Sequence, residues 1–331
     1  RYAQIAADLP WYAGTGNDDP VLDHQWQGAC YGAYARRWFL GDEPGAGKTR
    51  TSVGWADLVG AEKIVLVAEA NVCAQFAGEV MTLAPHRTLI NLAGLSAKTR
   101  HEHINSLLKR EEGVVVINYE MFRRDHTALA KIQMWQADTL IIDEAHNMKD
   151  PQSSNARYVR AIAFAQNTCP GCTGLVYGLE DPCPSCGWQV PDGNVKAYNL
   201  KTTKSSEMFL ESRSVKNLLA MTGTPVLNTP MDLFSIAHLI SPVEFPSKTK
   251  FKEDFTRPNY ATGKSEFTRG GLERIKNKLK GRYLARNLED VGIFLPKQHI
   301  HVERVELDPV KYPLQHRTIT QISDMAKIEM E

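Results

Sequence analysis

Long apolar runs are missing from this 331-residue sequence, and none approaches the ~18 residues that a membrane-spanning helix needs. The first residues, Arg1-Tyr2-Ala3-Gln4, lack the basic and then apolar character of a secretory signal. Cysteine is scarce, with six in the chain, and there is no internal repeat or low-complexity tract. These absences argue against a membrane protein and against a disulfide-rich secreted one. We therefore expect an intracellular protein, with cytoplasm and nucleus not distinguished.

The composition, with 43% hydrophobic and 23% charged residues, is ordinary for a globular protein with a large core and room for two modules. The net charge is only +1, but it is unevenly distributed. Residues 248–286, the basic segment, hold twelve Lys or Arg against four acids, which is +8 against −7 for the remainder. This imbalance predicts a polyanionic partner such as nucleic acid. The ordinary alternative is a solvated helical face, because Lys and Arg alternate with polar residues over 274–280.

One glycine-rich stretch has the residues of a phosphate-binding loop. It reads Gly41, Asp42, Glu43, Pro44, Gly45, Ala46, Gly47, Lys48 and Thr49. Glycines let main-chain N–H groups approach phosphate oxygens, and the N-terminus of a following helix adds its positive end. Lys48 would reach the β- and γ-phosphates, and the Thr49 hydroxyl would bind magnesium. The generic pattern has glycine at the position of Asp42, so an ordinary turn before Lys-Thr is the alternative.

An acidic pair follows a short apolar run about ninety residues later. Residues 139–142 are apolar and partly β-branched, as in a buried strand, and Asp143 and Glu144 come directly after it. Carboxylates at this end of a parallel strand lie where α/β sheets bind ligands. Asp143 would hold magnesium, through its water shell, and Glu144 would orient and deprotonate the attacking water. The alternative is an acidic helix N-terminus with no catalytic role.

Strand and helix signals alternate through the rest of the chain, which predicts an α/β protein with a mostly parallel sheet covered on both faces. Expected strands are 64–68, 87–92, 113–118 and 139–142, and expected helices are 23–40, 72–83 and 156–166. Asp23 is the expected N-cap of the first helix. Residues 168–193, rich in Cys, Pro and Gly, interrupt this pattern before core-like sequence returns at 217–225. We interpret the interrupting stretch as an insertion.

Four of the six cysteines lie in that insertion as two Cys-x-x-Cys pairs, Cys169 with Cys172 and Cys183 with Cys186. Four thiolates in this arrangement predict a tetrahedral structural zinc site in a zinc-ribbon-like element. Only ten residues separate the pairs, which is fewer than is typical. Two disulfides or redox-active dithiols are the alternatives. We interpret Cys30 and Cys73 as buried thiols.

With both nucleotide motifs placed, the chain resembles the Swi/Snf-type double-stranded DNA translocases of helicase superfamily two. Five stretches, of which two are the nucleotide motifs, carry the resemblance in the family's order: 24–28 with Gln25 as the adenine-sensing glutamine, 42–49, the Asp-Glu-Ala-His box 143–146 with Lys149, 221–228, and 232–255. Thr222, Gly223 and Thr224 fall in the third motif, which in the family couples hydrolysis to DNA movement. Arg286 and Leu295-Pro296 resemble the segment that closes the first lobe. Asp42 is then the family's residue, which accounts for its departure from the generic loop.

The resemblance implies a three-layer RecA-like lobe that binds ATP with magnesium and contacts double-stranded DNA through the basic segment. The implied organisation is a lead-in over 1–20, the lobe over 21–312 with the zinc-binding insertion at 167–195 and a basic helical protrusion at about 230–290, and a linker helix at 313–331. We expect a second RecA-like lobe, with arginine fingers, from the same natural chain or a partner. Residues 69–71 depart from the family, which has Pro and a basic residue there, so no DNA contact is expected at them.

Two other functions remain open. The chain could be the motor lobe of a strand-separating helicase or of a restriction or repair complex, which shares these motifs. It could instead be a zinc-containing nucleic-acid-binding module with a vestigial ATPase, although Lys48, Asp143 and Glu144 argue against that alternative.

Overall fold

The structure is a computed structural model. It describes residues 21–121, 125–164, 167–168, 175–176, 215–226, 229–259, 265–294 and 311. The chain divides into a unit that ends at Ile293 and a second unit from Phe294 to Glu331. All helices and strands within the described ranges lie in the first unit. Within the same ranges, no helix has the length and apolar character needed to cross a membrane.

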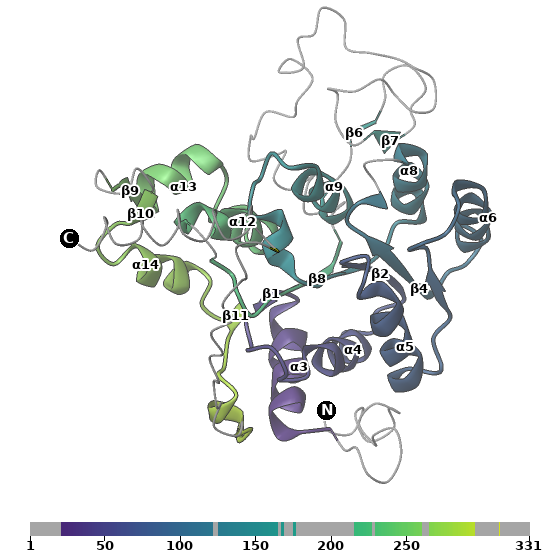
Figure 1. Cartoon of the computed structure of the whole chain (residues 1–331), viewed down its shortest axis with the longest axis horizontal. Helices are drawn as coiled ribbons and strands as arrows, with labels where there is room; N and C mark the ends of the chain where they lie inside the picture. The colour runs from purple at the N-terminus through teal and green to yellow at the C-terminus, as the bar shows by residue number, and fades with distance from the viewer. Residues whose placement is uncertain are drawn as a thin grey trace, which may run out of the picture. The chain divides into compact units, whose positions relative to one another are not determined.

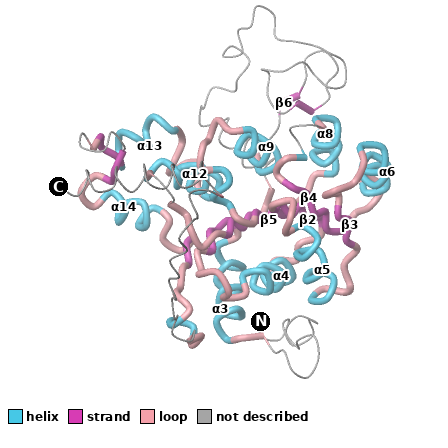
Figure 2. The backbone as a smooth tube through the Cα atoms, viewed as in Figure 1, coloured by secondary structure: helices cyan, strands magenta, loops and turns pink. Residues whose placement is uncertain are grey.

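A seven-stranded sheet in which every neighbouring pair is parallel forms the centre of the first unit (Figures 1 and 2). Its order is β11-β1-β8-β5-β2-β4-β3. The strands are β1 (Arg37–Leu40), β2 (Lys63–Ala68), β3 (Leu89–Asn91), β4 (Gly113–Asn118), β5 (Thr139–Ile142), β8 (Asn217–Met221) and β11 (Tyr283–Leu284). Every residue of β5 and β8 is buried, as expected for central strands of a parallel sheet covered on both faces. The predicted mostly parallel α/β architecture is therefore confirmed.

Helices cover both faces of this sheet and complete three layers (Figure 1). One face carries α3 (Asp23–Ala35), α4 (Lys48–Leu58) and α5 (Cys73–Leu83), and the other carries α6 (Ala97–Leu107), α8 (His126–Trp135), α9 (Ser154–Ala163) and α12 (Phe234–Ile240). Side chains along each strand alternate between the two layers. In β2, Ile64 and Leu66 pack with α3–α5, whereas Val65 and Val67 belong to the opposite apolar cluster.

The predicted helix over 23–40 is wrong in its second half. The helix ends at Ala35, Arg36 has a positive φ of 63°, and β1 begins at Arg37. The reason is that Trp38 and Phe39 fill opposite apolar layers, which a strand permits and a helix does not. Asp23 is the first helical residue, not the N-cap: that position belongs to Leu22, whose N–H donates to Gln25 Oε1.

Other predicted elements agree with the structure within a few residues. β4 and β5 have the predicted bounds, and β2 begins one residue earlier than predicted. β3 is shorter than its predicted range, α5 begins one residue late, and α9 begins two residues early. Strong apolar runs in the sequence therefore predicted the strands well. The exact ends of helices and strands depend on contacts with distant residues, which a short stretch of sequence does not contain.

The basic segment and the residues before it form a mixed structure, not a wholly helical one. Its elements are the short helix η3 (Pro230–Leu233), α12, α13 (Lys248–Phe255), α14 (Gly271–Lys278), the antiparallel strands β9 (Thr256–Pro258) and β10 (Ser265–Phe267), and β11. Phe245, Phe251 and Phe255 pack with ring centroids 5.1–5.9 Å apart. These rings, with Ile275 and Leu279, continue the apolar cluster of the sheet. The segment is therefore anchored to the core, and β11 returns from it to pair with β1.

Only a short antiparallel pair, β6 (Asn167–Thr168) with β7 (Leu175–Val176), is described in the predicted insertion. The four cysteines of the predicted zinc site lie outside the described residues.

Candidate functional site

An open cavity of about 920 Å³ lies beside the glycine-rich loop, which connects β1 to α4 at the carboxyl edge of the sheet. This is the edge at which parallel α/β sheets bind ligands. Its lining includes Gln25, the loop residues Pro44, Gly45 and Gly47, the first residues of α4, the acidic pair and part of α5. The volume is in the range of small-molecule sites, and the opening leaves the loop accessible.

The loop has the conformation that close approach to phosphates requires. Gly45 and Gly47 have φ values of 90° and 79°, a region in which residues other than glycine are strained. A Cβ on Gly47 would also lie 2.1 Å from Nε2 of Gln25, so the amide of Gln25 lies directly against the loop. The predicted adenine-sensing residue and the predicted phosphate loop therefore meet in one cavity.

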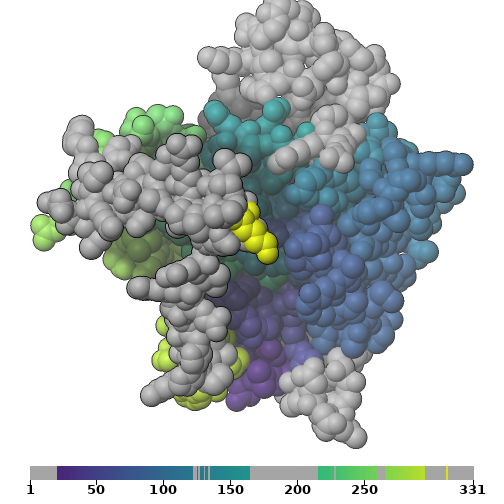
Figure 3. All heavy atoms as spheres, in the orientation of Figure 1, coloured from purple at the N-terminus to yellow at the C-terminus, as the bar shows by residue number. Residues whose placement is uncertain are grey.

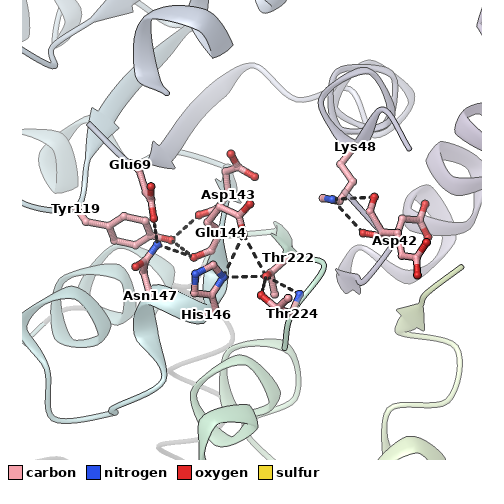
Figure 4. Close-up of polar contacts among 11 residues, drawn as sticks. Asp42, Lys48, Glu69, Tyr119, Asp143, Glu144, His146, Asn147, Thr222 and Thr224 are labelled. Carbon is pink, nitrogen blue, oxygen red and sulfur yellow. Dashed lines mark hydrogen bonds and ion pairs between the residues drawn. The ribbon is translucent and has the colours of Figure 1, made fainter. Parts of the chain in front are cut away.

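Lys48, at the first position of α4, is held by the start of its own loop. Its Nζ donates to the main-chain carbonyl oxygens of Asp42 at 3.0 Å and Glu43 at 3.2 Å (Figure 4). The side chain is thus bent back along the loop, and Lys48 lines the cavity. Thr49, the predicted magnesium ligand, lines the same cavity.

Asp143 follows β5 and also lines the cavity. Burial, followed by the charge of Glu144, raises the pKa of the Asp143 carboxyl to about 6, although the charge of Lys48 opposes the rise. The main chain is fixed from both sides: its N–H donates to Val67 O at 2.8 Å, and its carbonyl accepts from the buried Tyr119 hydroxyl at 2.7 Å. A cation in the cavity would favour the charged form of this carboxyl.

Glu144 occupies a left-handed conformation with φ of 44°, which is uncommon for a residue other than glycine. The side-chain amide of Asn147 stabilises it by donating to the Glu144 carbonyl at 3.1 Å and to the Glu69 carboxylate at 2.8 Å (Figure 4). Such strain persists only where surrounding contacts hold it, and it is concentrated at functional sites. The turn directs the Glu144 carboxylate toward the residues that follow β8.

Thr222 joins the acidic box to the third motif. Its hydroxyl lies 3.2 Å from Glu144 Oε2, 2.9 Å from His146 Nδ1 and 3.1 Å from the N–H of Thr224. A consistent assignment has the Thr222 hydroxyl donate to Glu144 and accept from the other two groups. Gly223 completes the contact, because a Cβ there would lie 2.7 Å from Pro44 of the phosphate loop. The third motif therefore contacts both the acidic pair, through Thr222, and the phosphate loop, through Gly223.

The structure separates the predicted site residues into two groups. Those that line the cavity are Gln25, Pro44, Gly45, Gly47, Lys48, Thr49, Asp143 and Glu144. The other predicted nucleotide-site and coupling residues in the described part of the chain do not line it: Asp42, Glu43, Ala46, Thr222, Gly223 and Thr224. The Asp42 side chain, 1% exposed, instead pairs with Arg286.

Sequence reasoning missed the residues that hold this site in place. Tyr119 and Glu69 follow β4 and β2, and each contacts the acidic turn after β5. His24 accompanies Gln25 and contacts the carbonyl of Ala46 through Nε2 at 2.8 Å. The only local signal for Tyr119 and Glu69 was their position just after an apolar run. Because β5, β2 and β4 are neighbours in the sheet, the residues that follow these strands lie close together.

Within the described ranges, no group of three or more His, Cys, Asp or Glu side chains could hold a metal ion. The predicted magnesium site has a smaller donor set, one hydroxyl and one carboxylate, and both line the cavity. A magnesium ion that keeps several waters and binds phosphate oxygens needs no more from the protein.

A parallel sheet with a phosphate loop after one strand and an acidic pair at the same edge defines a P-loop protein with a RecA-like fold. The chain belongs to the SNF2-related domain family, whose model matches residues 24–181 and 196–330.

Several known proteins are similar to this chain in sequence or in fold. The chromatin-remodeling ATPase INO80 of Arabidopsis thaliana is 23% identical over 293 residues, which is 85% of this chain and 16% of that protein. Helicase domino of Drosophila melanogaster is 32% identical over 110 residues, 32% of this chain and 3% of that protein. The SWI2/SNF2 ATPase core of Sulfolobus solfataricus, solved in complex with dsDNA, has a similar fold, with a TM-score of 0.56 and 19% sequence identity. The match covers 86% of this chain and 47% of that chain. The chain thus spans a small part of these curated relatives.

Proposed function

We propose that the chain is the ATP-binding lobe of an ATP-dependent double-stranded DNA translocase, which couples ATP hydrolysis to movement on DNA. The observation that carries the proposal is the meeting of the phosphate loop and the acidic pair around one cavity, with Thr222 in contact with Glu144. Family membership and the fold shared with an ATPase core bound to dsDNA support it. The proposed lobe is residues 21–312, with a linker helix over 313–331.

In this mechanism, main-chain N–H groups of the loop and Lys48 bind the triphosphate of ATP, and Gln25 contacts the adenine edge. Thr49 and, through water, Asp143 would hold magnesium, which neutralises charge on the phosphates. Glu144 accepts a proton from the water that attacks the γ-phosphate. Thr222 lies against that carboxylate and is therefore placed to sense its surroundings.

The basic segment supplies the proposed DNA contact. Lys248, Lys250 and Lys252 on α13 are exposed and have no ion-pair partner among the described residues. Figure 3 shows this segment, in green, at the surface of the molecule, away from the blue part of the chain that includes α5 and α6. Exposed lysines without partners are suited to DNA phosphates.

Nucleotide binding is tested with a fluorescent ATP analogue and magnesium. We expect Lys48→Ala to abolish binding, whereas Lys98→Ala, on the exposed side of α6, leaves it unchanged. Glu144→Gln should bind the analogue and, in a two-lobe protein, lose DNA-stimulated hydrolysis. For the 331-residue chain we expect weak binding and very slow turnover, because the arginines of a second lobe would stabilise the transition state. Full binding by Lys48→Ala would refute the proposed site.

Duplex binding is tested by replacing the three α13 lysines with alanine. The slope of log affinity against log salt should fall by as much as ~3, because each lost phosphate contact contributes about 0.9. The control replaces Lys98, Lys109 and Lys216, which are also exposed and change the net charge equally. Equal effects in both triple variants would show a general charge effect and not a DNA-binding surface.

The zinc-binding insertion belongs to the same proposal, with Cys169, Cys172, Cys183 and Cys186 as ligands. Four cysteines in two Cys-x-x-Cys pairs support it. Metal analysis of the purified chain should find one zinc equivalent. Less than about half an equivalent would count against the site.

A further inference from the structure

Arg286 makes a two-pronged ion pair with Asp42 at the start of the phosphate loop. Its Nε donates to Asp42 Oδ1 at 3.1 Å, and its Nη2 donates to Asp42 Oδ2 at 2.5 Å. The side chain of Arg286 is 14% exposed and that of Asp42 is 1% exposed. The third nitrogen, Nη1, donates to the His24 carbonyl at 2.8 Å, and the ring of His24 contacts Ala46 O. One guanidinium therefore holds the beginning of the loop directly and its later part through His24.

Main-chain contacts reinforce this attachment. The N–H of Glu43 donates to Arg286 O at 3.1 Å, and the N–H of Leu288 donates to the Glu43 carboxylate at 2.9 Å. The carbonyls of Asp42 and Glu43 are the groups that accept from Lys48 Nζ. The peptides that hold the lysine are thus held in turn by residues 286–288.

Gly28 leaves the space for the Arg286 guanidinium. A Cβ at this position of α3 would lie 3.1 Å from Nη2 of Arg286 and 3.0 Å from Cγ2 of Thr51. Both contacts are tighter than a side chain tolerates without movement of its neighbours. A side chain at this position of α3 would therefore crowd the guanidinium, and its neighbours would have to shift by a few tenths of an ångström.

We propose that Arg286 is a positioning residue of the nucleotide site, which fixes the phosphate loop and Lys48 through Asp42. The inference rests on the proposed function of this loop. Arg286 comes two residues after β11, a strand with two residues paired to β1, and β11 directly follows the exposed part of the basic segment. The arginine therefore reaches the phosphate loop from the strand that pairs with β1, and β1 leads directly into the loop.

The test compares Arg286→Gln and Arg286→Lys with Arg110→Gln, which removes an exposed arginine between α6 and β4, outside the basic segment. The affinity of each variant for the fluorescent ATP analogue is measured. We expect at least a tenfold loss for Arg286→Gln and little recovery for Arg286→Lys, because lysine keeps the charge without the two-pronged geometry. The affinity of Arg110→Gln should stay within twofold of that of the parent chain.

Two further variants separate positioning from loss of stability. Val65→Ala lowers the unfolding midpoint from the opposite layer, and nucleotide affinity should then remain within twofold. Asp42→Asn keeps the shape of the side chain and removes the charge that Arg286 binds, and we expect at least threefold weaker nucleotide binding. This variant decides the question if Arg286→Gln does not fold, and unchanged affinity in it would overturn the inference.

The outcomes for this inference and for the proposed function differ. Loss of binding in Lys48→Ala with affinity within twofold of the parent in Arg286→Gln refutes the positioning role alone. Retained binding in Lys48→Ala refutes the nucleotide site itself. Equal loss in Val65→Ala and Arg286→Gln at matched unfolding midpoints also overturns the positioning role.

Discussion

Replacing Asp143 with asparagine should stabilise the protein while destroying its magnesium-dependent nucleotide site. Burial and the neighbouring Glu144 charge raise the pKa of this carboxyl from 3.8 to about 6. At neutral pH the folded chain therefore carries an ionised group in an unfavourable position. A rise of this size corresponds to about 3 kcal/mol of unfolding free energy. Asparagine keeps nearly the same shape without the charge, so the expected gain at pH 8 is ~1–3 kcal/mol.

The pH dependence of that gain follows from the direction of the change in pKa. Below pH about 4 the carboxyl is protonated in both the folded and the unfolded chain, and asparagine offers no advantage. Between pH 4 and pH 6 the unfolded chain loses this proton while the folded chain retains it, so the stability of the parent chain falls as pH rises. Above pH about 6 the carboxyl is ionised in both the folded and the unfolded chain, so the loss of stability of the parent chain no longer increases. The advantage of Asp143→Asn should therefore appear over this range and then level off.

Urea unfolding followed by circular dichroism from pH 4 to pH 8 measures the difference directly. Glu102→Gln, on the exposed face of α6, removes a carboxylate without this burial and should change stability by less than ~0.5 kcal/mol. In parallel, Asp143→Asn should lose the magnesium dependence of nucleotide binding. A variant no more stable than the parent at pH 8, or a gain that increases toward pH 4, would refute the reasoning.

Three glycine and tyrosine substitutions test other contacts. Gly47→Ala should weaken nucleotide binding at least tenfold, because its Cβ would meet the Gln25 amide at 2.1 Å, whereas Gly60→Ala, with φ of 67° and open space around it, should strain the backbone without affecting binding. Gly32→Ala should cost ~1–3 kcal/mol in thermal or urea unfolding, since its Cβ would lie 2.2 Å from the indole of β1, and an unchanged midpoint would contradict the packing. Tyr119→Phe should cost ~1–2 kcal/mol by leaving a buried carbonyl without its donor, and a neutral result in the same assay would show that another group replaces it.

The strands that could be predicted from the sequence are those whose signal is local. β4 and β5 are nearly continuous apolar runs, because parallel strands covered on both faces bury almost every residue. β1 was missed because its four residues, Arg37–Leu40, follow a helix without a turn signal and begin with an arginine. Its strand conformation depends on pairing with β8 and β11, which are about 180 and 240 residues away. No short stretch of sequence contains that information.

The candidate site divides in the same way. Residues within one motif, such as Lys48 and Thr49, have roles that follow from their spacing and from the chemistry of phosphate binding. Tyr119 and Glu69 act through residues of the acidic turn, and these contacts arise only when the sheet order brings the strand ends together. His24 acts through Ala46, and this contact arises only when α3 packs beside the phosphate loop. Motif chemistry was therefore accessible from the sequence, and the supporting contacts were not.

Asp42 shows why the supporting contacts matter for function. A carboxylate in place of a loop glycine should repel a triphosphate if it faced the cavity. In the structure it is buried, does not line the cavity, and is neutralised by Arg286 through a two-pronged contact. The negative charge is thereby used to fix the loop's backbone, while glycines at 45 and 47 leave the phosphate side open. The departure from the generic loop is thus compatible with phosphate binding only because a residue 244 positions later in the chain supplies the opposite charge.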